Sequence, residues 1–269
     1  EKDMLRIAIQ AKGRLNEESI GLLAEAGVSI EDSKRKLLAR SNGFPLEVLY
    51  LRDDDIPQAV SMGVADLGVV GLNEVEEKGF DVEIVHRLGF GKCRLSLAVP
   101  KTEPYDGLSY FEGKRVATSY PVILSRFFRE KGIAAEIHEI AGSVEIAPSV
   151  GMADAIFDIV SSGGTLVTNG LKEVEQVLFS EAVLIGGRAL SDDKRQILSQ
   201  LLFRIEAVER SRGLKYVLMN LPHAKIPEAV RILPGMKSPT ILPLAQEGWS
   251  SMHVVINERE LWSKIEQLK

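Results

Sequence analysis

Cysteine is almost absent from this chain of 269 residues, since Cys93 is the only one. An internal disulfide is therefore impossible, which is typical of proteins of the reducing cytosol. Long apolar runs are absent as well, because none approaches the ~18–20 residues that cross a membrane. Residues 1–6 carry no apolar signal-peptide segment. We therefore expect a cytoplasmic protein that does not associate with membranes.

An excess of positive charge is lacking too. The 33 Lys and Arg residues are outnumbered by 38 Asp and Glu residues, which gives a formal net charge of −5. This balance disfavours nucleic acid or an anionic membrane as a partner, so an anionic substrate must be held by a local group of donors. The four histidines show no metal-site spacing with one another or with Cys93.

Apolar segments with strand and helix patterns alternate along the first two thirds of the chain. The spacing predicts strands over 5–10, 46–51, 66–70, 93–100 and 115–118, and helices after Asn16 as the cap, over 56–62, over 123–131 up to Gly132, and over 192–212. Such alternation indicates an α/β fold with a largely parallel sheet.

Two short strings recur and suggest two similar lobes. Gly63-Val-Ala-Asp66 returns as Gly151-Met-Ala-Asp154, and Arg6-Ile-Ala8 returns as Arg115-Val-Ala117. Short apolar strings also recur by chance. If the repeat is real, it predicts two α/β lobes facing each other across a cleft that is lined by loops at the carboxyl ends of strands.

The last part of the chain has a different pattern. Residues 214–269 read as strand, helix, strand, strand, helix, which is a ferredoxin-like unit without its final strand. Because an unpaired sheet position is usually avoided, we expect the native chain to continue past Lys269.

The most informative stretch is 154–166, which reads as a buried strand, a loop of small residues and the start of a helix. Backbone N–H groups of such a loop close around an anion, and hydroxyl groups add further donors. The loop lacks the lysine of a Walker-type phosphate loop, and an ordinary capped turn is the alternative. The residues expected to bind the phosphate are Ser161, Ser162, Gly163, Gly164 and Thr165.

Two carboxylates, Asp154 and Asp158, precede this loop. Their charge would repel a phosphate, so they suit the hydroxyl groups of a sugar or a bound cation. Positions four apart on a strand face the same side, so we expect both to point into one pocket. The alternative is that one of them only supports the loop.

Several strings, taken together and in order, resemble ATP phosphoribosyltransferase of histidine biosynthesis in its long, histidine-regulated form. The resemblance covers residues 5–269, and its strings are 8–15 (Ala-Ile-Gln-Ala-Lys-Gly-Arg-Leu), 63–71, 88–95, 115–121, 142–145, 154–171 and 238–243. It implies transfer of phosphoribosyl from 5-phosphoribosyl 1-pyrophosphate to N1 of ATP, with release of pyrophosphate and a requirement for Mg²⁺. The resemblance further implies histidine as feedback inhibitor and dimers that assemble into hexamers.

The resemblance also implies an architecture. A bilobed catalytic core like that of type II periplasmic binding proteins has lobe I at 1–98 and 184–212 and lobe II at 99–183. A ferredoxin-like, ACT-like α+β regulatory domain follows at 213–269.

Functional residues follow from the same resemblance. The loop 161–165 is assigned to the 5-phosphate, Asp154 and Asp158 to the ribose, and Arg14 joins the two aspartates as a catalytic residue. The remaining substrate-binding residues are Lys12, Arg52, Tyr120 and Glu145, and the histidine pocket includes Asn220, Met236 and Thr240. The alternatives are surface basic residues, a solvated loop glutamate and a core tyrosine.

Two other classes of protein fit part of the pattern. A non-catalytic bilobed solute-binding protein has the same two lobes, and an effector-sensing protein is built around a domain like 213–269.

Overall fold

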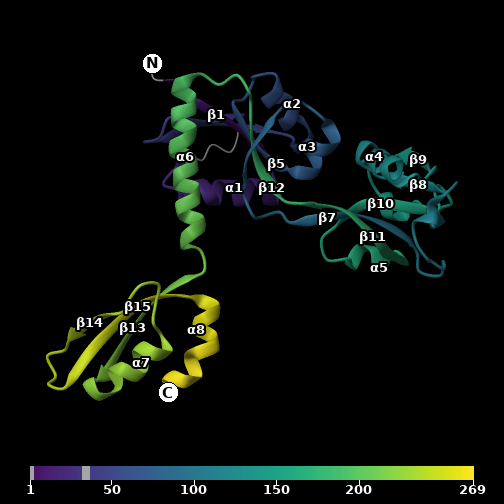
Figure 1. Cartoon of the computed structure of the whole chain (residues 1–269). Helices are drawn as coiled ribbons and strands as arrows, with labels where there is room; N and C mark the ends of the chain where they lie inside the picture. The colour runs from purple at the N-terminus through teal and green to yellow at the C-terminus, as the bar shows by residue number, and fades with distance from the viewer. Residues whose placement is uncertain (1–2, 32–36) are drawn as a thin grey trace. The chain divides into compact units, whose positions relative to one another are not determined.

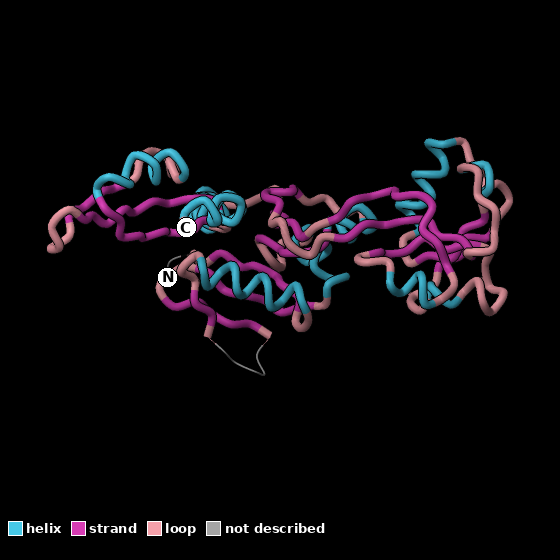
Figure 2. Tube along the Cα trace, turned by 90° about the horizontal axis from the view of Figure 1, so that it is seen from below, coloured by secondary structure: helices cyan, strands magenta, loops and turns pink. Residues whose placement is uncertain are grey.

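The computed structural model describes residues 3–31 and 37–269, and the chain divides into two compact units, 1–204 and 205–269. Figure 1 labels their helices and strands, and Figure 2 shows strands in magenta with helices in cyan against them. Each unit is described by itself. Within the described ranges, no helix combines the length and the apolar character needed to cross a membrane.

The first unit contains two sheets, and the larger one has seven strands in the order β2-β3-β4-β1-β5-β12-β6. β1 pairs in parallel with β4 and β5, whereas β12 runs antiparallel to β5 and β6, so only the centre of this sheet is parallel. Its strands are β1 (Leu5–Gln10), β2 (Ser29–Ile30), β3 (Leu38–Asn42), β4 (Leu46–Leu51), β5 (Leu67–Gly71), β6 (Glu83–Arg87) and β12 (Ala182–Gly186). Helices α1 (Arg14–Glu25), α2 (Ile56–Ser61) and α3 (Leu72–Lys78) connect them. We call this part lobe I.

The second sheet of the first unit, here lobe II, has five strands in the order β11-β7-β10-β8-β9. The strands are β7 (Cys93–Pro100), β8 (Arg115–Thr118), β9 (Glu136–Glu139), β10 (Ala155–Val160) and β11 (Leu171–Ser180), and the helices are α4 (Pro121–Lys131) and α5 (Gly164–Thr168). Because β7 belongs to this sheet, the chain enters lobe II before Cys93 and leaves it after Ser180, earlier at both ends than the predicted 99–183. The Pro- and Gly-containing loop 104–113 connects β7 with β8, which are strands of the same sheet. The composition of this loop therefore does not mark the boundary between the lobes.

The two recurring strings occupy equivalent places in the two lobes. In lobe I the Arg6 N–H donates to Asp66 Oδ2 (2.8 Å), and the Asp66 N–H donates to the Arg6 carbonyl (2.9 Å). In lobe II the Arg115 N–H donates to Asp154 Oδ2 (2.9 Å), and the Asp154 N–H donates to the Arg115 carbonyl (2.8 Å). The repeated Asp therefore ties the start of one strand to the start of its neighbour in both lobes.

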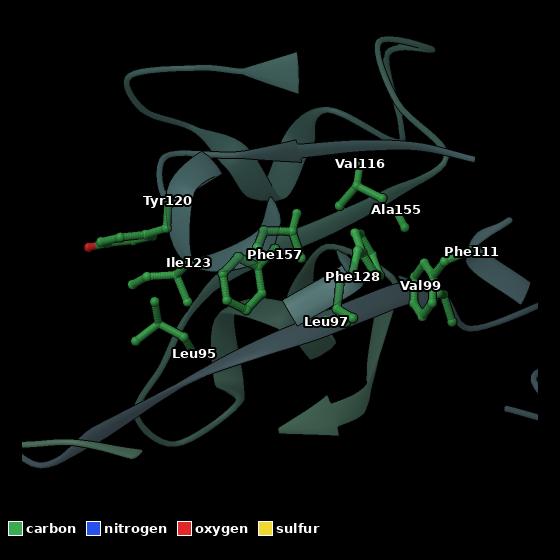
Figure 3. Packing of buried hydrophobic residues seen from close by; sticks show 11 residues of the cluster. Leu95, Leu97, Val99, Phe111, Val116, Tyr120, Ile123, Phe128, Ala155 and Phe157 are labelled. Carbon is green, nitrogen blue, oxygen red and sulfur yellow. The ribbon is translucent and has the colours of Figure 1, made fainter. Parts of the chain in front are cut away.

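Lobe II is held together by an apolar cluster between its sheet and α4, in which Phe157 lies among Leu95, Leu97 and Phe128 (Figure 3). Phe157 is fully buried because it is one of the inward residues of β10, whose neighbours β7 and β8 supply the adjacent side chains. The cluster fixes the position of β10, and thereby that of the loop that follows it.

The second unit has the predicted ferredoxin-like order. β13 (Leu214–Pro222), β15 (Trp249–Asn257) and β14 (Thr240–Pro243) form an antiparallel sheet with β15 in the centre. Helices α7 (Ile226–Ile232) and α8 (Glu258–Lys264) contribute to one apolar cluster with alternate residues of β13 and β15. The long helix α6 (Asp192–Ser211) crosses the boundary between the two units along the chain.

Several local predictions differ from the structure. Helix α1 begins at Arg14, directly after Gly13 with its φ of 103°, and Asn16 is not its cap. Instead the Asn16 side chain donates to the Gln10 carbonyl (2.8 Å). The elements β2, β3, α3, β6, β9, β11 and β12 were not predicted. All of them except β11 and β12 are short and only partly buried, so their apolar periodicity is weak.

We expect Phe157→Ala to lower the free energy of unfolding of the first unit by about 3–5 kcal/mol, since it removes a fully buried aromatic ring and leaves a cavity. Phe179→Ala is the matched control, because Phe179 lies in the same sheet but is 67% exposed. Urea unfolding followed by circular dichroism measures both, because the two tryptophans, Trp249 and Trp262, lie in the second unit and do not report on the first. Equal losses for the two variants would contradict the described core.

Candidate functional site

Two cavities of the first unit share a wall formed by Glu145 and Asp158. The smaller has a volume of about 130 Å³ and is lined by the end of β10 and the loop after it. The larger has a volume of about 480 Å³ and is lined by residues of both lobes. The two cavities are therefore adjacent, with these two carboxylates between them.

The smaller cavity contains the predicted loop. Ser161, Ser162, Gly163 and Thr165 line it, and Gly164 is the first residue of α5. Gly163 has a φ of 85°, a left-handed conformation that favours glycine, although a Cβ there would meet no other atom within 4 Å. Helix α5 has only five residues, so its dipole is short, and the hydroxyl and N–H groups of the loop are the main donors.

Asp158 lies near the carboxyl end of β10, half-buried and facing both cavities. Burial raises the pKa of this carboxyl group, and the charge of Glu145 adds to the effect, while a hydrogen bond from the Ile159 N–H (2.8 Å) opposes it. Among the described residues, no basic side chain contributes to this balance, and the Asp158 carboxyl group faces the two cavities.

Asp154 is not brought together with Asp158. It precedes β10 and forms an ion pair with Arg115 (3.2 Å), and hydrogen bonds from the Arg115 side chain and backbone lower its pKa. Four residues of strand span about 13 Å, so the two carboxylates share a side of the strand but lie at opposite ends of it. Asp154 lines neither of the two cavities, contrary to the expectation of one common pocket.

The larger cavity is rich in carboxylates. Its acidic lining residues are Asp54, Glu74, Glu77, Glu139, Glu145 and Asp158, and Lys78 is the basic one. Burial raises the pKa of Glu74, and the neighbouring charge of Asp53 raises it further. The wall is therefore rich in acceptors, and most of its groups carry negative charge at neutral pH.

The predicted basic residues lie outside the residues that line this cavity. Lys12 and Arg14 follow β1, and Arg52 follows β4, so all three lie at the same edge of lobe I, because β1 and β4 are parallel. Arg14 is 80% exposed and pairs with Glu18 on α1 (2.7 Å). Arg52 pairs with Asp54 (3.3 Å), which does line the cavity, so its guanidinium group lies at the rim.

Helix α3 of lobe I contacts α4 of lobe II, and the sequence did not predict this contact. Both oxygens of the Glu77 carboxylate accept hydrogen bonds from the start of α4, namely from the N–H groups of Val122 and Ile123 (2.9 Å each). The neighbouring Glu76 pairs with Arg126 of α4 (3.1 Å). A carboxylate at a helix N-terminus is favourable because it satisfies free N–H groups and the helix dipole. In the sequence, only the acidic pair Glu76-Glu77 and the helix-ending Gly79 that follows Lys78 indicate a short helix here.

Tyr120, the residue before α4, belongs to both the core and the cavity. Its ring packs in the lobe II cluster, while its hydroxyl oxygen points out of that cluster (Figure 3). The side chain also lines the larger cavity. Tyr120 is therefore a core residue that also borders the cavity, and its contact with a nucleotide stays a prediction.

The predicted effector residues lie in the second unit. Met236 and Thr240 line a cavity of about 660 Å³ together with Tyr216 and His253, whose side chains are hydrogen-bonded to each other. Asn220 borders a different cavity. Alternation along β13 puts Asn220 on the sheet face opposite the apolar cluster, because Met219 and Leu221 belong to that cluster.

Comparison with family models gives two matches that together span most of the chain. Residues 52–207 match the model described as ATP phosphoribosyltransferase, and residues 211–269 match the model described as HisG, C-terminal domain. Among curated relatives, an ATP phosphoribosyltransferase from Bacteroides thetaiotaomicron is 61% identical over 266 residues, covering 99% of this chain and 94% of the relative. One from Cytophaga hutchinsonii is 51% identical, covering 99% and 93%.

Solved structures with a similar fold agree with the family match. The ATP phosphoribosyl transferase (HisG:HisZ) complex from Thermotoga maritima matches with a TM-score of 0.66 and 29% identity, covering 77% of this chain and 99% of that chain. A periplasmic sulfonate-binding protein from Methylobacillus flagellatus matches with a TM-score of 0.54 and 15% identity, covering 79% and 70%. The second likeness shows that the predicted bilobed periplasmic-binding-protein fold is present.

The raised pKa of Asp158 predicts a stability effect of its own. Folding favours the protonated form, so the ionised carboxylate lowers stability at pH values above the folded-state pKa, and this loss disappears below the ordinary Asp value. Asp158→Asn keeps an acceptor for the Ile159 N–H but carries no charge. We expect it to raise the Tm at pH 7 by on the order of 1–4 °C, with no gain at about pH 3.

The control for this measurement is Asp106→Asn, at an exposed position of the same lobe. We expect this variant to have the same Tm as the wild type at each of the two pH values. Differential scanning calorimetry at both pH values measures the effect. A lower Tm for Asp158→Asn at pH 7 would show that a favourable charge interaction outweighs the burial.

Proposed function

The chain belongs to the ATP phosphoribosyltransferase family in its long form, and from this premise we propose how residues of its two cavities carry out the transfer. The enzyme moves phosphoribosyl from 5-phosphoribosyl 1-pyrophosphate to N1 of ATP and releases pyrophosphate, the first step of histidine biosynthesis. The bond from the anomeric carbon to pyrophosphate breaks as the bond to N1 forms. Positioning and electrostatics are therefore the main means of catalysis.

We assign the smaller cavity to the 5-phosphate and the shared wall to the ribose. The single observation that carries this is that Asp158 and Glu145 line both cavities, next to a loop of hydroxyl and N–H donors. A phosphate among Ser161, Ser162, Gly163 and Thr165 leaves the ribose hydroxyl groups beside Asp158. The pyrophosphate and the adenine then occupy the larger cavity. Gly164 completes the loop as the first residue of α5.

The carboxylates of the larger cavity suit the transition state better than the ground state. Positive charge develops on the ribose as pyrophosphate departs, and the negative wall stabilises that charge. The same wall repels the two anionic substrates. We propose that cations bound to the substrates offset this repulsion.

Mg²⁺ is the cation that we propose. Among the described residues no three His, Cys, Asp or Glu side chains form a ready-made metal site, so the fit must be judged from single carboxylates. Mg²⁺ is commonly held by one or two carboxylates together with substrate phosphates and water, and Glu145 at the shared wall meets that requirement. When bound, the ion neutralises the departing pyrophosphate.

Arg52, Lys12 and Arg14 are proposed as contacts for the phosphates of ATP. Their loops follow parallel strands at one edge of lobe I, and Arg52 already reaches the rim of the cavity through Asp54. Arg14 requires only the release of an exposed ion pair with Glu18, which contributes about 0.3–0.5 kcal/mol.

Asp154 is proposed as a supporting residue, in place of the catalytic role first expected. Its carboxylate is already occupied by Arg115, and its counterpart in lobe I, Asp66, bonds Arg6 in the same way. Removal of Asp154 then acts through the position of β10 and leaves the chemistry of the ribose untouched.

We also propose a cellular location and an oligomeric state for the protein. A single cysteine supports a cytoplasmic location. Exposed apolar residues on the open face of the second unit's sheet, among them Leu218 and Leu242, support assembly into dimers and hexamers. A bilobed fold alone also suits a solute-binding protein, but membership of the family favours the enzyme.

Thr165→Val tests the phosphate loop. It removes one hydroxyl donor without changing the shape of the side chain, and a lost hydrogen bond to a charged group costs about 1.5–3 kcal/mol. We therefore expect the KM for 5-phosphoribosyl 1-pyrophosphate to rise about tenfold or more, with the KM for ATP nearly unchanged. The assay follows phosphoribosyl-ATP absorbance with pyrophosphatase present.

Thr168→Val is the matched control in the same short helix. The Thr168 hydroxyl donates to the Gly164 carbonyl (2.9 Å) and does not line the cavity. Equal KM values for the wild type and Thr165→Val would remove the loop from its proposed role.

Histidine is proposed as the effector that binds to the second unit. Met236 and Thr240 share a cavity whose lining includes both polar and apolar residues. We expect L-histidine to inhibit the reaction and Thr240→Ala to weaken the inhibition about tenfold. Ser263→Ala, a change on α8 away from that cavity, serves as control. Inhibition that is the same in all three proteins would argue against this site.

A further inference from the structure

A buried asparagine, Asn73, connects the end of β11 in lobe II with Tyr120 in the wall of the larger cavity. It lies in the first turn of α3 and is 7% exposed. Its backbone N–H donates to the Ser180 hydroxyl oxygen (3.1 Å), and its Oδ1 accepts from the same hydroxyl group (2.9 Å). Its Nδ2 donates to the Tyr120 hydroxyl oxygen (3.2 Å). One side chain thus joins two segments that are far apart in the sequence.

These bonds have a direction. The Ser180 oxygen accepts from a backbone N–H, so its own hydrogen is free to be donated to the Asn73 carbonyl oxygen. That bond orients the amide with its NH₂ group toward Tyr120, because the two ends of an amide differ in hydrogen-bonding character. The phenol oxygen of Tyr120 is consequently an acceptor on the Asn73 side.

An acceptor on one side leaves the hydroxyl hydrogen of Tyr120 available on the other. The hydroxyl group points out of the lobe II cluster, and Tyr120 lines the larger cavity (Figure 3). Burial, followed by the charge of Glu74, raises the pKa of Tyr120, so the phenol keeps its hydrogen at neutral pH. In a wall that contains six carboxylates, this hydrogen belongs to a neutral donor.

We propose that Asn73 is a positioning residue that aims the hydroxyl hydrogen of Tyr120 into the larger cavity, where it donates to an acceptor atom of the nucleotide. Ser180 holds the amide in the orientation that this requires. The inference rests on the proposed function, since it takes the larger cavity to be the site of ATP. Asn73 itself does not touch the substrate.

The discriminating change is Asn73→Asp. A carboxylate has nearly the same shape but only accepts hydrogen bonds, so the Tyr120 hydroxyl would donate to it and turn away from the cavity. We expect the Kd for ATP, measured by calorimetry on the full chain, to rise about tenfold. Tyr120→Phe removes the donor, and we expect a rise of the same size. In the double variant the two effects should not add.

Ser180→Ala is the second variant, because a new buried charge at position 73 can also impair folding. It leaves Asn73 unchanged but removes the bond that orients its amide, and we expect the Kd for ATP to rise severalfold. Asn257→Asp is the control for the substitution itself. Asn257 caps α8 by accepting from the Arg259 N–H (3.0 Å), a role that aspartate fulfils equally well, so the Kd should not change.

The outcomes separate the inference from its premise. If Tyr120→Phe leaves the Kd for ATP unchanged, the placement of the nucleotide is wrong. If Tyr120→Phe weakens ATP binding while Asn73→Asp and Ser180→Ala do not, or if the effects of Tyr120→Phe and Asn73→Asp add, Asn73 does not position the hydroxyl group. Non-additive losses with an intact thermal unfolding transition support the proposal.

Discussion

The contact between Glu77 and the first N–H groups of α4 is the interaction on which the site depends. It places a carboxylate of lobe I at a helix terminus of lobe II, where two N–H groups lack partners within the helix. The larger cavity needs residues from both lobes, and this contact, the Glu76–Arg126 ion pair and the Asn73 hydrogen bonds all help to hold the lobes together. Helix α3, although only seven residues long, therefore matters more to the site than the long α6.

Charge distinguishes the two cavities and is the basis of the different roles that we propose for them. The smaller cavity offers hydroxyl and N–H donors, which suit a phosphate that stays in place. The larger cavity offers carboxylates, which suit a carbon that becomes positive and which need accompanying cations when anionic molecules enter. Asp158 lines both cavities, and its raised pKa reflects burial without a basic partner among the described residues.

Much of the fold was predictable because its signals are local. The strand, small-residue loop and helix around Gly163 appear where the pattern indicated, and α4 ends at Gly132 as expected. The site was less predictable. Asn73 meets Ser180 across 107 positions of sequence, and neither residue type in its local setting indicates a hydrogen bond at that distance. Short edge elements such as β6 have too weak a periodicity to be recognised.

The sequence by itself determined the alternation of strands and helices, the ferredoxin-like order of the last unit and the loop of small residues that follows β10. These follow from hydrophobic periodicity and from the conformational freedom of glycine, which act over a few residues. Only the tertiary structure decided between Asp154 and Asp158, whose local settings look alike. Arg115, 39 positions away from Asp154, pairs with that carboxylate, whereas Asp158 pairs with no basic side chain in the described ranges and faces the cavities. The choice depends on which strand lies next to β10, and that is set by packing across the whole lobe.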